Sequence, residues 1–85
     1  MTTSALTVYG ADWCRDCRRT KALLENLAVD FAYIDLEQDQ AAAVRAQEIS
    51  GMTRIPVVVY PDGTHQVEPT DDAVRTKLAE LATSL

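Results

Sequence analysis

The sequence has no apolar run approaching the roughly 20 residues that a membrane-spanning helix needs. Residues 1–5 are too few and too uncharged to form a secretory signal. We therefore expect a cytoplasmic protein that does not bind a membrane. A formal net charge of −5 also argues against nucleic acid or an anionic membrane surface as its main partner.

Cysteine and histidine are scarce, because Cys14, Cys17 and His65 are the only residues of these two types. A bridge between the two cysteines would close a very short loop and stabilise the fold little, so we attribute the pair to reactivity. A closed zinc site requires four ligands, and we predict no metal ligands and no cofactor besides a redox-active Cys14–Cys17 disulfide. The alternative is a non-catalytic module in which the C-x-x-C pairs of two chains share zinc or an iron–sulfur cluster.

No repeat, low-complexity tract or linker interrupts the 85 residues, of which 47% are hydrophobic. A chain of this length and composition can bury its own core, so we expect one domain over residues 1–85. The hydrophobic periodicity predicts an α/β protein with the element order β-α-β-α-β-β-α. The predicted strands are residues 6–9, 31–36, 53–60 and 65–67, and the predicted helices are residues 17–28, 40–49 and a third one after residue 70.

The arrangement of these elements can be narrowed further. A whole helix separates the first two strands, so they should lie parallel in one sheet. The unbroken valines of Val57–Val59 predict a central strand buried on both faces, with Pro56 at its first position. Asp39 and Thr70 are placed to cap the second and third helices, and Gly51 is placed to end the second.

The two cysteines stand three residues apart where the first helix begins. Their sulfurs can therefore meet on one helix face and cycle between dithiol and disulfide. The positive end of the helix favours the thiolate of Cys14, and Arg15 and Arg18 strengthen this effect if their guanidinium groups face the sulfur. We expect Cys14 to attack a substrate disulfide and Cys17 to resolve the mixed disulfide that results.

Some neighbouring residues have two interpretations. Four of the eight basic residues lie around the cysteines, either as a solvated helix face or as a patch for a thiolate or anionic substrate. They are Arg15, Arg18, Arg19 and Lys21. Trp13 is either a substrate platform beside the sulfur or a cover for the sheet edge. Tyr9, Tyr33 and Tyr60 lie on predicted strands, and we interpret them as packing residues rather than catalytic ones.

Four stretches form a specific combination: Val8–Cys17, Ile55–Val58, Asp62–Gly63 and Thr70–Val74. Over nearly the whole chain they resemble the glutaredoxin branch of the thioredoxin fold, most of all the actinobacterial mycoredoxins. The resemblance implies a four-stranded mixed sheet flanked by helices, a cis Ile55–Pro56 peptide facing the cysteines, and a thiol-disulfide oxidoreductase. We expect substrate contacts from Trp13, Arg15, Arg54, Ile55, Pro56, Thr70 and Asp71.

Departures from the family pattern bear on the substrate. Glutathione-using glutaredoxins carry Lys, Tyr and Thr at the positions that Ala11, Asp16 and Arg54 occupy here, which favours mycothiol over glutathione. The resemblance to mycoredoxins implies reduction of mixed disulfides between proteins and a mycothiol-like thiol. We expect the protein to act as a monomer and also to reduce protein disulfides. The alternative is a redoxin that thioredoxin reductase recharges directly and that donates electrons to a protein such as ribonucleotide reductase.

Overall fold

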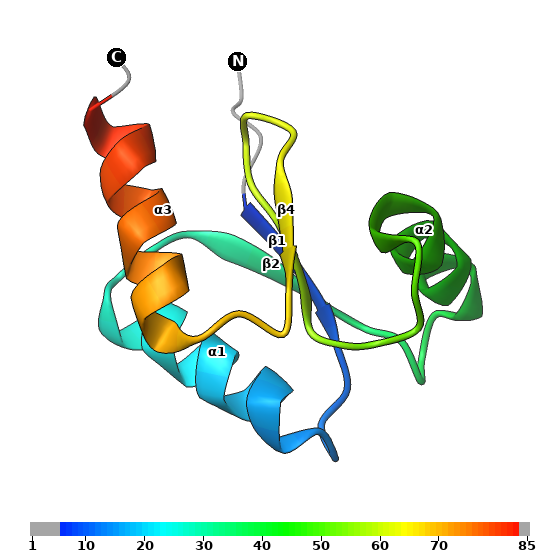
Figure 1. The fold of residues 1–85 in the computed structure, drawn as a ribbon. Helices are drawn as coiled ribbons and strands as arrows, with labels where there is room; N and C mark the ends of the chain where they lie inside the picture. The colour runs from blue at the N-terminus through cyan, green and yellow to red at the C-terminus, as the bar shows by residue number, and fades with distance from the viewer. Residues whose placement is uncertain (1–5, 84–85) are drawn as a thin grey trace.

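Seven elements follow the predicted order along the chain (Figure 1). The computed structural model describes residues 6–83. Its strands are β1 (Leu6–Gly10), β2 (Phe31–Asp35), β3 (Val57–Val59) and β4 (His65–Val67), and its helices are α1 (Arg15–Asn26), α2 (Gln40–Ser50) and α3 (Asp71–Thr83). Within this range no helix combines the length and the apolar character that crossing a bilayer requires.

The four strands form one mixed sheet in the order β2-β1-β3-β4. Strands β1 and β2 are parallel, as their separation by a helix predicts, with Val8 opposite Tyr33. Strand β3 runs antiparallel to β1, with Val8 opposite Val58, and β4 runs antiparallel to β3. The expected four-stranded mixed sheet and the internal position of β3 are therefore confirmed.

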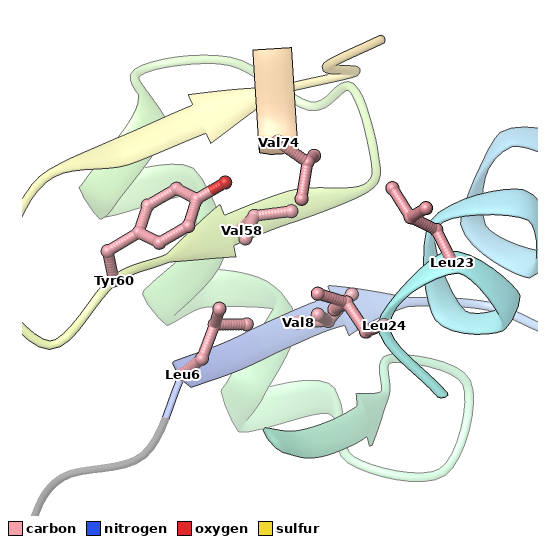
Figure 2. Packing of buried hydrophobic residues seen from close by; sticks show 7 residues of the cluster. All are labelled: Leu6, Val8, Leu23, Leu24, Val58, Tyr60 and Val74. Carbon is pink, nitrogen blue, oxygen red and sulfur yellow. The ribbon is translucent and has the colours of Figure 1, made fainter. Parts of the chain in front are cut away.

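Helices cover both faces of the sheet, because successive strand residues point to opposite sides. On one face Leu6 and Val8 pack with α1 and α3, in the cluster that Figure 2 shows: Leu6, Val8, Leu23, Leu24, Val58, Tyr60 and Val74. On the other face Tyr9 packs against Ala42 and Ala46 of α2. Figure 1 shows the same division, with α1 and α3 on one side of the sheet and α2 on the other. This arrangement fixes the start of α1 at one end of β1.

The helix that carries the cysteines is shifted relative to its predicted range. It begins at Arg15, two residues earlier than expected, and ends at Asn26. Its end is a Schellman motif, in which the amides of Ala28 and Val29 bond to the carbonyls of Glu25 and Leu24. Ala28 occupies the left-handed position with φ 56°, where glycine is usual, so no sequence signal marked this end.

The strand predicted over residues 53–60 is wrong in its extent. Only Val57–Val59 pair in the sheet. Residues 53–56 precede it as a loop, and the Ile55–Pro56 peptide is cis, as the family resemblance implies. The predicted caps are confirmed: the Ala42 amide donates to Asp39 at 3.0 Å, and the Ala73 amide donates to the Thr70 hydroxyl at 3.1 Å.

Candidate active site

Cys14 is the N-cap residue of α1, so its sulfur lies at the end of the helix where the amides are unpaired. Its Sγ accepts a hydrogen bond from the Cys17 backbone N–H at 3.3 Å. Its own thiol donates to the Ile55 carbonyl oxygen at 3.9 Å, across the gap to the loop before β3. Neither cysteine forms a disulfide in this structure. The geometry allows a disulfide partner at Cys17 and provides an amide that favours the thiolate of Cys14.

The two sulfurs differ in their access to solvent. Cys14 is 9% exposed, whereas Cys17 is completely buried. Burial, and after it the hydrogen bond with Cys14, raises the pKa of the Cys17 thiol to about 12. Cys17 therefore keeps its proton at neutral pH. Of the two thiols, Cys14 is the one that a substrate disulfide can reach first.

A groove of about 490 Å³ opens beside Cys14. It brings together four of the residues predicted to bind substrate, and its lining is Trp13, Cys14, Arg15, Asp16, Thr53, Arg54, Ile55 and Glu68. Trp13 is 65% exposed and stands as a wall of the groove. Pro56 is buried and does not line the groove.

The groove carries charges of both signs. Arg54 lies 3.7 Å from the Glu68 carboxylate, and both side chains are open to solvent. A smaller hollow of about 230 Å³ shares Trp13, Arg54 and Ile55 with the groove and reaches Met52 and α2. A substrate next to Cys14 would thus meet an aromatic face, guanidinium groups and an apolar hollow.

Thr70 and Asp71 are not in this groove. They line a separate hollow together with Arg19 and Asp72. The Arg19 guanidinium donates to the Pro69 carbonyl oxygen at 3.0 Å and lies 3.5 Å from Asp71. Asp71, one of the predicted substrate contacts, is therefore held in an ion pair between α1 and α3.

The other basic residues around the cysteines also make internal contacts. Arg18 donates to the Asp12 carbonyl oxygen at 2.7 Å, and the Lys21 ammonium lies 4.5 Å from the centre of the Tyr33 ring. Arg15, in contrast, lines the groove beside Cys14. The four basic residues around the cysteines thus form neither a plain solvated face nor a uniform anion site. Among them, Arg15 lines the groove.

Sequence reasoning missed Gly10 and Tyr33. The first strand, predicted over residues 6–9, extends by one residue to Gly10, which pairs with Asp35. A Cβ on Gly10 would lie 2.8 Å from the Tyr33 hydroxyl and 2.9 Å from Cys17 Sγ. These two atoms therefore crowd around the same point next to the resolving cysteine. Only the packing of β2 under α1 reveals this, since Tyr33 looks like an ordinary strand residue in the sequence.

Metal ligands do not gather at this site. Within residues 6–83, no group of three or more His, Cys, Asp or Glu side chains could hold a metal ion. His65 lies on β4, where it was expected.

Known proteins share this fold. The glutaredoxin family model matches residues 6–66. Mycoredoxin 1 of Corynebacterium glutamicum is 37% identical over 81 residues, which cover 93% of this chain and 99% of that protein. The glutaredoxin structure from Archaeoglobus fulgidus has a TM-score of 0.75 and 29% identity, covering 95% of this chain and 88% of that one.

A second structural neighbour is NrdH-redoxin from Escherichia coli, a glutaredoxin-like protein with a thioredoxin-like activity profile. Its TM-score is 0.71 at 27% identity, and the match covers 84% of this chain and 91% of that one. The chain therefore belongs to the glutaredoxin family, has a thioredoxin-like fold, and is a thiol-disulfide oxidoreductase.

Proposed function

We propose that the Cys14–Cys17 dithiol reduces mixed disulfides between proteins and a low-molecular-weight thiol similar to mycothiol. The asymmetry of the two sulfurs carries this proposal. Cys14 lines the groove, and its sulfur accepts a hydrogen bond from a helix amide. Cys17 is buried and keeps its proton. The similarity to mycoredoxin 1 supports the choice of thiol. The protein would act as a monomer in the cytoplasm, where thiols are kept reduced.

The reaction begins when the Cys14 thiolate attacks one sulfur of the substrate disulfide. A bond forms between Cys14 and that sulfur, while the other sulfur leaves as a thiolate and takes up a proton. For a protein–thiol mixed disulfide, a second small thiol can then attack the small thiol held on Cys14. That step regenerates Cys14 and releases a disulfide of two small thiols, so Cys17 is not required.

Reduction of a protein disulfide takes a different second step. The Cys17 sulfur attacks Cys14, the Cys14–Cys17 disulfide forms, and the reduced substrate leaves. The two cysteines are then oxidised by two electrons and must be recharged by a thiol or a reductase.

Substrate recognition is proposed for Trp13, Arg15, Arg54 and Ile55, which line the groove with Cys14. A carboxylate or hydroxyl of the thiol would compete with Glu68 for Arg54. Pro56 would support this wall from behind. Thr70 and Asp71 would contact only a substrate that extends beyond the groove. Such a substrate would compete with the ion pair between Asp71 and Arg19.

Variants of the two cysteines test the proposal. Cys17→Ser should keep mixed-disulfide reduction and lose protein-disulfide reduction, whereas Cys14→Ser should lose both. Full activity of Cys14→Ser, or equal loss of both reactions in Cys17→Ser, would contradict the assigned roles.

A second candidate is a redoxin that thioredoxin reductase recharges directly and that serves a protein such as ribonucleotide reductase. The fold similarity to NrdH-redoxin favours it. The oxidised protein should be offered mycothiol with its reductase, glutathione with its reductase, or thioredoxin reductase. Re-reduction by the mycothiol system supports the first candidate, and re-reduction by thioredoxin reductase alone supports the second.

A further inference from the structure

The hydroxyl of Tyr33 is buried and, among the described residues, has no hydrogen-bond partner. A buried hydroxyl without a partner costs stability relative to a phenyl ring of the same shape. Tyr33 lies in the interior of β2, where a phenylalanine would pack the same ring without that cost. The hydroxyl therefore calls for an explanation other than packing.

Its surroundings point to the resolving cysteine. The Tyr33 oxygen and Cys17 Sγ would both lie within 3 Å of a single methyl group on Gly10, at 2.8 and 2.9 Å. The absence of a side chain on Gly10 leaves the space between them open. The sulfur is completely buried there, so water cannot solvate a thiolate at this position.

The dithiol reaction nevertheless requires a thiolate at Cys17. The Ala11 amide lowers the pKa of Cys17, but burial and the hydrogen bond with Cys14 raise it more. A further donor at this place would favour the charged form. In the reduced protein the Tyr33 hydroxyl makes no hydrogen bond to Cys17, so a small shift of the ring or of the sulfur accompanies this contact while the hydroxyl hydrogen turns about its C–O bond toward the charge.

We propose that Tyr33 donates a hydrogen bond to the Cys17 thiolate during resolution and thereby acts as a positioning residue specific to the dithiol reaction. This inference rests on the proposed function. In that step Cys17 loses its proton to solvent, and its thiolate attacks Cys14 Sγ. The Cys14–Cys17 bond forms, the bond from Cys14 to the substrate sulfur breaks, and the departing thiolate takes a proton from solvent. Tyr33 keeps its own proton throughout.

Two further features suit this role. Burial, together with the nearby sulfur of Cys17 and neighbouring carboxylates, raises the pKa of Tyr33 to about 12, so the hydroxyl remains a donor at neutral pH. The Lys21 ammonium lies over the ring at 4.5 Å, which holds the ring in place and polarises it.

The test is Tyr33→Phe, with Tyr60→Phe as the matched control. The Tyr60 hydroxyl donates to Gln66, so its loss also removes one hydroxyl from the core but at a different place. Both variants should be assayed for protein-disulfide reduction and, with Cys17→Ser added, for mixed-disulfide reduction by Cys14 alone. Single-turnover resolution can be followed through Trp13, the only tryptophan of the chain.

Tyr33→Phe should slow resolution and the turnover of protein disulfides about tenfold, the loss expected for one hydrogen bond to a charged group. It should lower kcat rather than raise KM, and its thermal midpoint should not fall. Adding Tyr33→Phe to Cys17→Ser should change nothing further, and Tyr60→Phe should resolve at the wild-type rate.

Resolution of Tyr33→Phe at the wild-type rate would overturn the inference. So would equal slowing in the presence and absence of Cys17, because a purely structural role would affect both reactions. Failure of the proposed function gives another result, since it would appear as activity of Cys14→Ser with Tyr33 intact. The two failures are therefore distinguishable.

Discussion

A methyl group added at Gly10 would press directly on the buried side of the active site. Its contacts with the Tyr33 oxygen (2.8 Å) and Cys17 Sγ (2.9 Å) are about 0.5 Å shorter than ordinary van der Waals contact. Overpacking of this kind typically costs about 1–3 kcal/mol. The gain from a less flexible unfolded chain is only about 0.4–1 kcal/mol. We therefore expect Gly10→Ala to destabilise the protein, because Cys17 is completely buried and the Tyr33 hydroxyl is enclosed.

The displacement should also affect the chemistry. Cys17 sits on the first turn of α1 and cannot move without disturbing Cys14, so Gly10→Ala should slow protein-disulfide reduction. The reaction that needs Cys14 alone should be less affected. Thermal unfolding should show a loss of roughly 4–8 °C for each kcal/mol in a domain of this size.

A double-mutant cycle with Tyr33→Phe gives the decisive measurement. Phenylalanine lacks the oxygen at 2.8 Å, so the double variant should recover part of the stability lost by Gly10→Ala. Gly51→Ala serves as the control, since Gly51 has a positive φ of 76° but no atom within 4 Å of the added methyl. It should lose stability through backbone strain and leave the redox reaction unchanged. Wild-type stability of Gly10→Ala, or simple additivity with Tyr33→Phe, would refute the reasoning.

Arg54, Asp39 and Asp62 test three other parts of the molecule. Arg54→Ala should raise KM for an anionic mixed disulfide about 2- to 5-fold without changing kcat, as suits an exposed charge, and an unchanged KM in steady-state assays would contradict the groove assignment. Asp39→Ala removes the acceptor of the Ala42 amide and should cost about 1 kcal/mol in denaturant unfolding, whereas an unchanged midpoint would deny the cap. The Lys77 ammonium, 2.7 Å from Asp62, holds the pKa of that carboxyl well below its usual range, so its stabilising effect is present at neutral pH and is lost as pH falls below about 4. The thermal midpoint should therefore fall more steeply with acidification in the wild type than in Asp62→Asn, and equal slopes would count against this ion pair.

Sequence patterns predicted much of the fold because they act locally. Alternation and helical periodicity located all seven elements, and single polar side chains marked the caps at Asp39 and Thr70. The groove was also accessible from sequence, since Trp13 adjoins Cys14, the resemblance supplied Ile55, and Arg54 precedes Ile55 in the chain. These predictions needed only short-range chemistry or a known pattern.

The remaining features depend on tertiary packing. Ala28 follows α1 in the left-handed conformation, which an alanine in the sequence does not indicate. The helix was therefore predicted to end at residue 28 instead of Asn26. Arg19 draws Asp71 into an ion pair that a linear reading cannot foresee, because 52 positions separate the two residues. The meeting of Tyr33 with the space above Gly10 likewise requires β2 to lie beside β1 with α1 across both.

Cys14 and Cys17 are the only two cysteines of the chain, and their pairing also affects how the protein reacts with oxidants. Peroxide would oxidise the accessible Cys14 to a sulfenic acid, the first step of a series that ends in irreversible sulfonic acid. Cys17 lies close enough to condense with that acid, releasing water and forming the same disulfide that catalysis produces. Because the chain has no third cysteine, the oxidised protein carries no free thiol that could crosslink it to another molecule. Oxidative damage is thereby converted into a state from which an ordinary reductant can recover the protein.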